Sequence, residues 1–427
     1  MNIEEALSYI HKTKWLGTKP GLSRTRRLLG ALGDPQKSLK FVHVAGTNGK
    51  GSTCAMIASI LRESGFCVGL YTSPYITVFN ERMQVDGQNI TDDELIHIVE
   101  TIRPAADAMT DDPPTEFEVI TAAAMLYFLE KKCDLVVLEV GMGGTLDSTN
   151  VIESPECACS VICAIGLDHT AYLGDTVEKI AAVKAGILKE NAPAVMYPEK
   201  ESVEKVIRSA AKEKHCPLTT PDFSLLSVQK YSLDGIDFSY GSLSDLHLPL
   251  IGTYQPHNAA VAIETARVLR MRGYGISDED IRRGLSEVVW KGRFEVLRKE
   301  PVFLLDGSHN PHGMRATVDA IRQYFGEQKL HFVLGAMADK DVSTMLSLLL
   351  PEAERFYTVT APNPRAMTGE ELAQRIRSLG GKAEAFGSIE KAVRAAAQNA
   401  GKDGVCAALG TLYFSQEVRS AVEGLSL

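Results

Sequence analysis

Hydrophobic residues follow two alternating patterns along the chain: short apolar runs, and longer stretches in which apolar residues recur every three or four positions. The runs are typical of buried strands, and the longer stretches are typical of helices that bury one face. Their alternation predicts a mostly parallel sheet covered by helices on both faces. In the first two thirds of the chain the predicted strands are residues 41–45, 67–71, 134–139 and 160–165. The predicted helices there are residues 53–64, 92–108, 116–131, 176–188, 202–214, 256–272 and 277–288.

Three further stretches complete the prediction. Residues 2–33 have a helical pattern that a turn at Lys19-Pro20-Gly21 interrupts, and residues 223–251 are rich in strand-forming residues. A second series of strands, separated by helical patterns, comprises residues 302–306, 330–334, 355–359, 383–386 and 405–409. Because 427 residues are long for one core, we expect two domains. These are an α/β domain over residues 1–298, with a P-loop-type, mostly parallel sheet and a small β-rich extension, and a Rossmann-like α/β domain over residues 299–427.

Composition and charge exclude several classes of protein. A hydrophobic content of 45% and a charged content of 23% are ordinary for a soluble globular protein. The net charge of -9 argues against nucleic acid as a partner, which needs a basic face. No apolar stretch has the length of a membrane span, and the N-terminus lacks the pattern of a signal peptide. We expect a cytoplasmic monomer without a membrane partner.

Eight cysteines in a chain of this size do not suggest a disulfide scaffold. Cys157, Cys159 and Cys163 are closely spaced, and a metal site is one interpretation of that spacing. They lie in or beside an apolar run, however, and no fourth ligand with suitable spacing follows. Small thiols in a buried strand are the favoured interpretation.

A glycine-rich segment between the first predicted strand and its helix has the pattern of a phosphate-binding loop. In Gly46-Thr-Asn-Gly-Lys-Gly-Ser52, backbone N–H groups and a helix N-terminus would face phosphates, and Lys50 would add a positive charge. The candidate residues of this segment for binding nucleotide phosphates are Asn48, Gly49, Lys50, Gly51 and Ser52. The usual first glycine is replaced by Val44, and the hydroxyl residue that usually binds magnesium is replaced by Gly51. The metal ligands must therefore come from elsewhere.

Three candidate metal ligands follow predicted strands. Ser73, Glu139 and His169 each lie at or just after the carboxyl end of a strand, where ligands of open α/β sheets bind. A hydroxyl, a carboxylate and an imidazole are all possible ligands of a Mg²⁺ that bridges phosphates. Taken singly, these residues are more often a turn cap, a surface charge and a hydrogen-bonded loop histidine, and their shared location is what favours the metal site.

These candidate residues belong to a series of motifs that occur one after another along the chain. They are Gly46–Ser52, Thr72-Ser-Pro-Tyr75, Phe79-Asn-Glu-Arg82, Glu139-Val-Gly-Met-Gly-Gly144, Leu146-Asp147, Thr149-Asn150, Gly166-Leu-Asp-His169, Lys184-Ala-Gly-Ile187, Trp290-Lys-Gly-Arg293 and Asp306-Gly-Ser-His-Asn-Pro311. Over residues 15–415 the chain closely resembles the folylpolyglutamate synthase/dihydrofolate synthase family of the Mur ligase superfamily. Gly51 is the discriminating residue, since peptidoglycan Mur ligases usually carry a hydroxyl residue directly after the lysine.

The resemblance implies an ATP-dependent ligase. ATP would convert the carboxylate of a folate, or of dihydropteroate, into an acyl phosphate that the amine of L-glutamate attacks. Two Mg²⁺ sites are implied, the first held by Ser73 and Glu139 and the second by His169. Lys184 matches a family lysine that is often carbamylated, although Val183 replaces the glutamate common before it. An ordinary surface lysine is the alternative.

The resemblance also implies residues beyond the first domain's sheet. Asn258 would contact the adenine, Arg293 a phosphate, and Asp306 the ribose or its surroundings. His309 would lie near the nucleotide or the incoming glutamate, so that Lys50, Lys184 and His309 are the catalytic candidates. Considered alone, Arg293 would more often form a surface ion pair and Asp306 would more often cap a helix. For His309 a capping or structural role is the alternative.

For the pteridine or pteroate substrate, the implied contacts come from three loops. The candidates are Phe79, Arg82, Phe117, Leu146, Asp147 and Ser148. Phe117 offers a flat ring for stacking, although a core phenylalanine is an equal alternative. The chain departs from the family at Thr145, where arginine is usual, and at Tyr75, where histidine or phenylalanine is common, so the finer substrate preference stays open.

Two other functions are compatible with parts of the sequence. One is a Mur-type ligase acting on a UDP-muramoyl peptide, which Gly51 and the lack of an extra N-terminal UDP-binding domain oppose. The other is a non-catalytic nucleotide-binding regulator, which the presence of Lys50, Ser73, Glu139 and His169 opposes.

Overall fold

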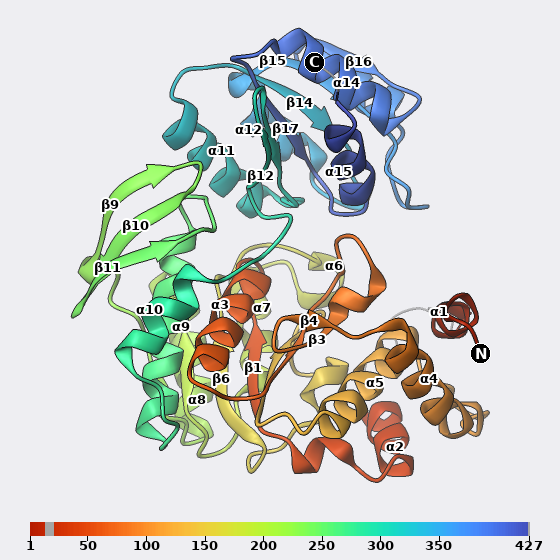
Figure 1. The fold of residues 1–427 in the computed structure, drawn as a ribbon, viewed down its shortest axis with the longest axis vertical. Coiled ribbons are helices and arrows are strands. Elements are labelled where there is room, and N and C mark those ends of the chain that lie inside the picture. Colours follow the sequence, from red (N-terminus) through yellow and green to blue (C-terminus); the bar gives the residue numbers. More distant parts are fainter. Residues whose placement is uncertain (13–20, 426–427) are drawn as a thin grey trace. The chain divides into compact units, whose positions relative to one another are not determined.

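The computed structural model describes residues 1–12 and 21–425, and these form two compact units (Figure 1). Unit 1 comprises Met1–Leu226, Tyr240–Leu246 and His257–Val288. Unit 2 comprises Ser227–Ser239, His247–Pro256 and the chain from Val289 onward. The predicted turn at Lys19 and Pro20 lies outside the described residues.

Unit 1 contains an eight-stranded sheet with the order β4-β3-β2-β5-β1-β6-β7-β8. Its six strands from β2 to β8 in this order run parallel, and β3 and β4 are antiparallel additions at one edge. The strands are β1 (Phe41–Ala45), β2 (Val68–Tyr71), β3 (Met83–Val85), β4 (Gln88–Asn89), β5 (Leu135–Glu139), β6 (Cys157–Ile162), β7 (Ala194–Met196) and β8 (Leu218–Thr219). The predicted mostly parallel sheet is confirmed.

The helices around this sheet pack on it or on one another. They are α1 (Ile3–Lys12), α2 (Ser23–Ala31), α3 (Lys50–Glu63), α4 (Asp92–Asp107), α5 (Glu116–Glu130), α6 (Thr170–Leu173), α7 (Val177–Lys184), α8 (Glu201–Glu213), α9 (Gln255–Met271) and α10 (Asp278–Ser286). Short 3₁₀ turns are η1 (Pro35–Ser38), η2 (Phe79–Arg82), η3 (Ser148–Val151), η4 (Ala185–Ile187) and η5 (Phe223–Leu225). One apolar core joins strand residues such as Phe41 and Val136 to α1, α2, α4 and α5, and another joins β6 and β7 to α7 and α8.

Local sequence explains where two of these helices begin. Thr91 and Thr115 are N-caps whose hydroxyls accept the N–H groups of Glu94 and Glu118, and both glutamates return a hydrogen bond to the cap backbone. Such capping boxes satisfy N–H groups that a helix start leaves unpaired. They place α4 and α5 within one residue of their predicted ends. Helix α3 begins three residues earlier than predicted, inside the glycine-rich segment.

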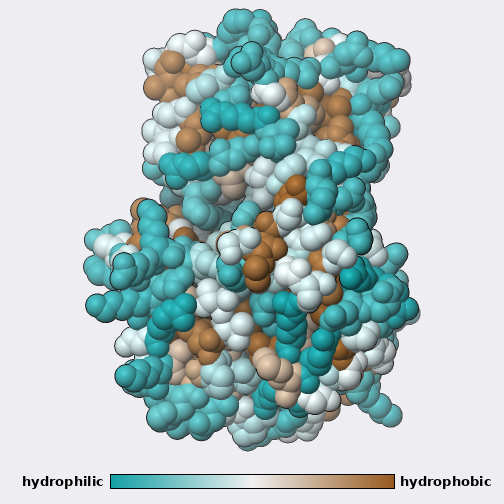
Figure 2. Space-filling model, turned by 90° about the vertical axis from the view of Figure 1, so that its left-hand side faces the viewer, coloured by the Kyte–Doolittle hydropathy of each residue, from teal (hydrophilic) through white to brown (hydrophobic). Residues whose placement is uncertain are grey.

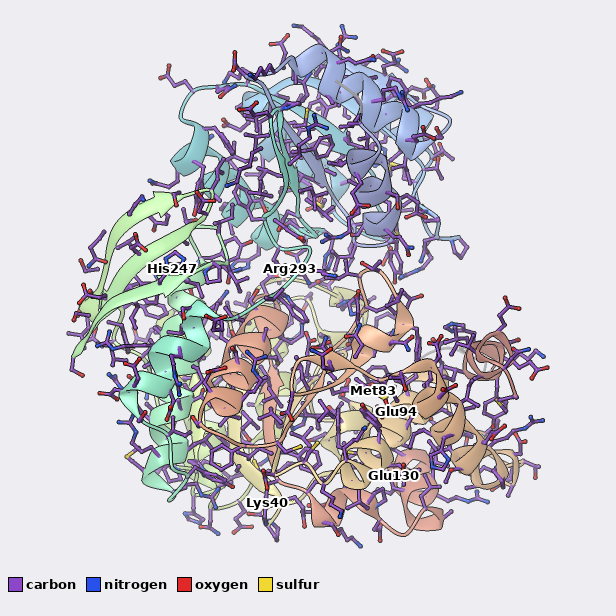
Figure 3. The ribbon with its side chains drawn as sticks, in the orientation of Figure 1. Lys40, Met83, Glu94, Glu130, His247 and Arg293 are labelled. Carbon is purple, nitrogen blue, oxygen red and sulfur yellow. The ribbon has the colours of Figure 1, made fainter. Side chains whose placement is uncertain are left out.

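A three-stranded sheet follows β8. Its strands β9 (Leu226–Ser232), β10 (Gly235–Tyr240) and β11 (Leu243–Leu248) have the order β11-β10-β9. The predicted β-rich extension over residues 223–251 is therefore present. His247, labelled in Figure 3, lies on β11 and contacts Asp237 of β10 through Nδ1 and Oδ1 at 2.7 Å.

Unit 2 contains a six-stranded sheet with the order β12-β13-β17-β14-β15-β16. The strands are β12 (Glu295–Lys299), β13 (Val302–Leu305), β14 (Leu330–Leu334), β15 (Ala353–Thr358), β16 (Ala383–Ala385) and β17 (Val405–Leu409). The helices are α11 (Pro311–Phe325), α12 (Val342–Leu349), α13 (Gly369–Ser378), α14 (Ile389–Ala400) and α15 (Ser415–Glu423), with the 3₁₀ turn η6 (Leu350–Glu352). Two apolar cores contain different residues of the same strands, as expected for a sheet covered on both faces.

Strand β12 explains why the compact unit does not begin at residue 299. It pairs antiparallel with β13, so residues 295–299 belong structurally with the strand that follows them. Its side chains are mostly half-buried, and the sequence Glu-Val-Leu-Arg-Lys lacks the apolar run that marked the other strands. Residues 289–298, assigned by sequence to the first domain, lie in unit 2.

All eight cysteines are free thiols. Cys157 and Cys159 lie in β6, Cys163 follows this strand, and all three are buried. Their interpretation as thiols of a buried strand is confirmed.

One face of the molecule is mainly polar. On the face drawn in Figure 2, hydrophobic residues occur in small groups within a largely hydrophilic surface. Among residues 1–12 and 21–425, no helix combines the length and the apolar character needed to cross a bilayer.

Candidate active site

The glycine-rich segment joins β1 to α3 at the carboxyl end of the unit 1 sheet. Lys40 precedes β1 at the opposite end of this strand (Figure 3). The N–H groups of Thr47 and Asn48 donate to the carbonyl of Ala164 at 2.8 and 3.2 Å. The Thr47 hydroxyl donates to the carbonyl of Gly166 at 3.0 Å. The loop is thus attached to the segment that follows β6, next to it in the sheet.

Gly49 has a backbone conformation that requires glycine. Its φ is +80°, and a Cβ there would lie 2.6 Å from Oδ1 of Asn258. The structure therefore brings together the predicted adenine residue Asn258, on α9, and the phosphate loop. Lys50 starts α3 and donates from Nζ to the carbonyl of Thr47 at 3.3 Å. Gly51 and Ser52 occupy the first turn of the same helix.

Two predicted metal ligands lie together beside this loop. Glu139 ends β5, is only 4% exposed, and accepts the N–H of Ser73 on Oε2 at 3.0 Å. Ser73 follows β2, which is the parallel neighbour of β5, and Glu139 pairs in register with Val44 of β1. A buried carboxylate beside a hydroxyl is a set of oxygen donors that suits a hard cation such as Mg²⁺.

His169, the third predicted ligand, is held in a different way. It has a φ of +50°, precedes the short helix α6, and has a side chain that is 38% exposed. The backbone N–H of His169 donates to Oδ1 of Asp168 at 2.8 Å, and the ring Nε2 of His169 lies 3.9 Å from Oδ2 of Asp168. Asp168 thus orients the loop that carries His169. The metal role of His169 stays a prediction.

Lys184 is a buried lysine, which excludes the surface-lysine alternative. It ends α7, is 3% exposed, and donates from Nζ to the carbonyl of Gly46 at 2.8 Å. Burial, reinforced by the charge of Lys50, lowers its pKa to about 7, although Asp168 and Asp147 act in the opposite direction. The phosphate loop is therefore in direct contact with an amine that is easily deprotonated.

A glycine loop, residues 141–144, connects Glu139 to the predicted substrate residues. A Cβ on Gly144 would lie 2.6 Å from the carbonyl oxygen of Val183, so the loop packs on the end of α7. A Cβ on Gly141 would lie 2.3 Å from Cζ of Phe117. Phe117 also packs against the core under α5 and contacts Tyr71, with ring centroids 6.2 Å apart. Its contacts are those of a partly buried core residue whose ring also touches this loop.

The other predicted substrate loop, residues 73–83, is built around Arg82. The guanidinium lies 5.4 Å from the ring centroid of Tyr75 and 5.6 Å from that of Phe79. Phe79 itself is buried in the core beneath the loop. Nε and Nη1 of Arg82 are buried and have no hydrogen-bond partner within the described part of the chain. Arg82 therefore has unused donors for an acceptor group such as a carboxylate.

Leu146, Asp147 and Ser148 differ in exposure. Leu146 is 51% exposed, whereas Asp147 and Ser148 are buried. Asp147 accepts hydrogen bonds from the backbone of Met142 and from Thr149. Thr149 in turn contacts His43 of β1. His43 is a site residue that the motifs do not include, although a histidine within the apolar run of β1 is a signal of a buried polar contact.

In unit 2 the three predicted residues lie around Gly307. Asp306 is buried and accepts the N–H groups of Phe294 and Ser308 at 2.8 and 3.0 Å. Nη1 of Arg293, labelled in Figure 3, would lie 2.4 Å from a Cβ on Gly307. Nδ1 of His309 contacts the carbonyl of Gly307 at 2.8 Å. Arg293, Asp306 and His309 are therefore brought together at the start of α11.

Two family models and many known proteins match this chain. A model of the Mur ligase middle domain matches residues 44–266, and a model of the Mur ligase glutamate ligase domain matches residues 292–412. The chain is 36% identical to the dihydrofolate synthase/folylpolyglutamate synthase of Bacillus subtilis, over 98% of this chain and 99% of the relative.

Solved structures with a similar fold cover all or nearly all of this chain. A Mycobacterium tuberculosis folylpolyglutamate synthase complexed with ADP and AMPPCP has a TM-score of 0.89 and 28% identity, and covers 100% of both chains. Escherichia coli FolC in complex with DHPP and ADP has a TM-score of 0.86 and 29% identity, over 99% of this chain and 98% of that chain.

Proposed function

Because the chain belongs to the folylpolyglutamate synthase/dihydrofolate synthase family of Mur ligases, we propose that it is an ATP-dependent ligase that joins L-glutamate to a folate-type carboxylate. The acceptor is tetrahydrofolate or its polyglutamates, and dihydropteroate is a second acceptor. One observation carries the proposal: a phosphate loop, a buried carboxylate and a buried lysine lie together at one edge of the unit 1 sheet. A cytoplasmic location stays a prediction.

The reaction has two chemical steps. The acceptor carboxylate attacks the γ-phosphorus of ATP, an acyl phosphate forms and ADP leaves. The amine of L-glutamate then attacks the acyl carbon, loses a proton and displaces inorganic phosphate, which leaves an amide. Phosphoryl transfer depends mainly on positioning and on neutralisation of charge.

The residues of the phosphate loop supply both requirements. The N–H groups at the start of α3 and the ammonium of Lys50 would hold phosphate oxygens. Asn258, which packs against Gly49, would contact the nucleotide. Ser73 and Glu139 would hold a Mg²⁺, which neutralises phosphate charge, and His169 would help to hold a second ion.

Lys184 is proposed to be carbamylated. With a pKa of about 7, a large fraction of this amine is neutral near neutral pH and able to attack CO₂. The nitrogen then loses a proton, and the product carries a negative charge beside the phosphate loop. Protein incubated with ¹³C-bicarbonate should show a carbamate resonance that Lys184→Met lacks. The same spectrum from both proteins would contradict the proposal.

The acceptor is proposed to contact two loops. Arg82 has unused N–H donors for a carboxylate or a pteridine carbonyl. Phe117 contacts the glycine loop at Gly141, and Leu146 follows that loop in sequence. Both side chains offer apolar surface to a flat ring. Phe79, Asp147 and Ser148 are buried and would support this surface from below. The roles of Arg293, Asp306 and His309 toward nucleotide and glutamate stay predictions.

The experiment that tests this function compares two acceptors. Purified protein receives ATP, Mg²⁺ and L-glutamate with dihydropteroate in one tube and tetrahydrofolate in another, and products are identified by mass. We expect phosphate release that needs both acceptor and glutamate. Phosphate release that is independent of both would overturn the proposal, and turnover of a UDP-muramoyl peptide would favour the Mur-type alternative.

Lys50→Ala provides the matched variant. Its substitution removes the ammonium from the phosphate loop but leaves a good helix former at the start of α3. We expect turnover to fall by at least about a hundredfold while the circular dichroism spectrum and Tm stay close to those of the wild type. Normal turnover would remove Lys50 from the mechanism. ATP binding without amide formation in the wild type would favour a non-catalytic regulator.

A further inference from the structure

Asp147 is a buried carboxylate that three donors hold. It is 7% exposed, and its Oδ2 accepts the N–H of Met142 at 2.8 Å. Its Oδ1 accepts the N–H of Thr149 at 3.0 Å and the hydroxyl of Thr149 at 2.5 Å. These contacts make Asp147 the junction between the glycine loop at residues 141–144 and the turn η3.

The direction of the next hydrogen bond follows from the state of Asp147. Burial raises the pKa of Asp147, whereas its hydrogen bonds to Met142 and Thr149 lower that pKa, and the backbone N–H groups donated to both of its oxygens favour the ionised form. An ionised carboxylate only accepts, so the hydroxyl proton of Thr149 points to Asp147. The oxygen of that hydroxyl, Oγ1, lies 2.9 Å from Nε2 of His43 and must therefore accept from it. His43 thus carries a proton on Nε2.

The other nitrogen of His43 supports the same tautomer. Nδ1 is buried and has no hydrogen-bond partner among the residues that the structure describes. A neutral imidazole has one N–H, and a buried N–H without an acceptor is costly. Burial lowers the pKa of His43, which keeps the ring neutral. Two separate arguments therefore assign the proton to Nε2.

The chain of hydrogen bonds ends at a loop that borders the proposed site. Met142 lies in the glycine loop, which follows Glu139 and packs on Phe117 at Gly141 and on the end of α7 at Gly144. Strand β1, which carries His43, lies between β5 and β6 in the sheet. A rigid central strand is thus connected to the loop through Thr149 and Asp147.

We propose that His43 is a positioning residue for the ligase reaction: through Thr149 it orients Asp147, and Asp147 holds the glycine loop where the folate-type acceptor binds. The inference rests on the proposed function. His43 touches neither substrate nor phosphate in this role. The Nε2–H of His43 directs the hydroxyl proton of Thr149 toward Asp147. Asp147 in turn holds the backbone N–H of Met142.

Two matched pairs of variants test the proposal. Thr149→Val removes the hydroxyl at nearly constant volume, and Thr149→Ser retains it. His43→Leu removes the donor, and His43→Gln places an amide N–H near the position of Nε2. KM for tetrahydrofolate, KM for ATP, kcat and Tm are measured for each variant.

We expect Thr149→Val and His43→Leu to raise the acceptor KM by about tenfold, the effect of one lost hydrogen bond to a charged network. KM for ATP should change by less than about twofold, because the phosphate loop is held by separate contacts. Thr149→Ser and His43→Gln should recover most of the affinity. The double variant His43→Leu/Thr149→Val should be no worse than either single variant, since both act through Asp147.

A spectroscopic measurement separates this role from general stability. In protein labelled with ¹⁵N-histidine, the His43 signals, identified by their loss in His43→Gln, should be those of a neutral ring protonated on Nε2. A charged ring or a proton on Nδ1 would overturn the inference. This readout stands even if His43→Leu fails to fold, as does the Thr149 pair.

The kinetic results distinguish failure of this inference from failure of the proposed function. An active wild type with unchanged acceptor KM in Thr149→Val overturns this inference alone, and so do equal changes for ATP and acceptor. A wild type that forms no glutamate-dependent product overturns the proposed function and this inference with it.

Discussion

At the scale of single residues, burial decides the chemistry of Lys184. Its ammonium would be expensive to hold in the interior, and its contact with the carbonyl of Gly46 needs only one N–H. Burial therefore lowers the pKa from 10.5 to about 7. The same side chain on a surface helix would be almost entirely protonated at neutral pH and would offer very little neutral amine to CO₂.

The lowered pKa predicts how stability depends on pH. Below about pH 7 both the folded and the unfolded state hold the Lys184 proton, whereas between about 7 and 10.5 only the unfolded state holds it. The unfolded state then binds more protons, so the contribution of Lys184 to the free energy of unfolding increases with pH across this window. Urea unfolding in CO₂-free buffer should show wild type gaining stability relative to Lys184→Met from pH 7 to 10. A constant difference between the two proteins would contradict the pKa shift.

The candidate site was predictable where residues follow strand ends. Ser73 and Glu139 were expected together because parallel neighbours end at one edge, and they form a hydrogen bond. The sequence did not show that Lys184 is buried, because α7 has only weak amphipathic periodicity and its last residue packs under a loop far away in sequence. Nor did it show the contact between His43 and Thr149, because these residues lie more than a hundred positions apart.

At the scale of elements, close approach of two helix backbones holds α3 in place. A Cβ on Gly284 of α10 would lie 2.4 Å from Cα of Ile60 and 2.6 Å from its backbone nitrogen. Neither atom belongs to a flexible side chain, so an added methyl group must separate the helices. Because α3 begins at Lys50, the position of this crossing also positions the phosphate loop.

Gly284→Ala is therefore expected to destabilise unit 1 by about 1–3 kcal/mol, the usual effect of overpacking. Gly30→Ala is the control: this position lies in α2, and a Cβ there would meet no atom within 4 Å. Alanine at such a helical site should be neutral or stabilising. Urea unfolding compares the two variants. Equal stabilisation of both would show that the α3–α10 contact tolerates a methyl group.

Elements with strong local signals were predictable, and those defined by pairing were not. The capping boxes of α4 and α5 are readable as Thr-x-x-Glu, and both helices were expected within one residue. Strand β12 is recognisable mainly through its pairing with β13, and β3 and β4 are two or three residues long. Their existence depends on neighbours and not on periodicity.

At the scale of the whole molecule, charge predicts a monomer. The net charge is -9, and like charge opposes self-association. Light scattering during size-exclusion chromatography should give a mass of 46.4 kDa at all loading concentrations. A mass that doubles with concentration would contradict this prediction.

The fold class followed from alternation of strands and helices, but the strand order did not. Placing β1 between β5 and β6 requires knowledge of contacts over long separations, which periodicity does not contain. The two-unit division was expected from length, whereas the assignment of residues 227–239 and 247–256 to unit 2 reflects packing alone.

The central place of β1 has a consequence for synthesis on the ribosome. This strand carries the phosphate loop, yet its partners β5 and β6 end at residues 139 and 162. At about 5–20 residues per second, roughly 5–20 s pass between translation of β1 and that of β6. Until β5 is made, both hydrogen-bonding edges of this apolar strand lack their native partners, and the edge that pairs with β6 stays open until β6 follows. The first strand of the sheet to be made is thus paired only after a long delay, and during that time the nascent chain exposes an unpaired apolar strand, which favours aggregation.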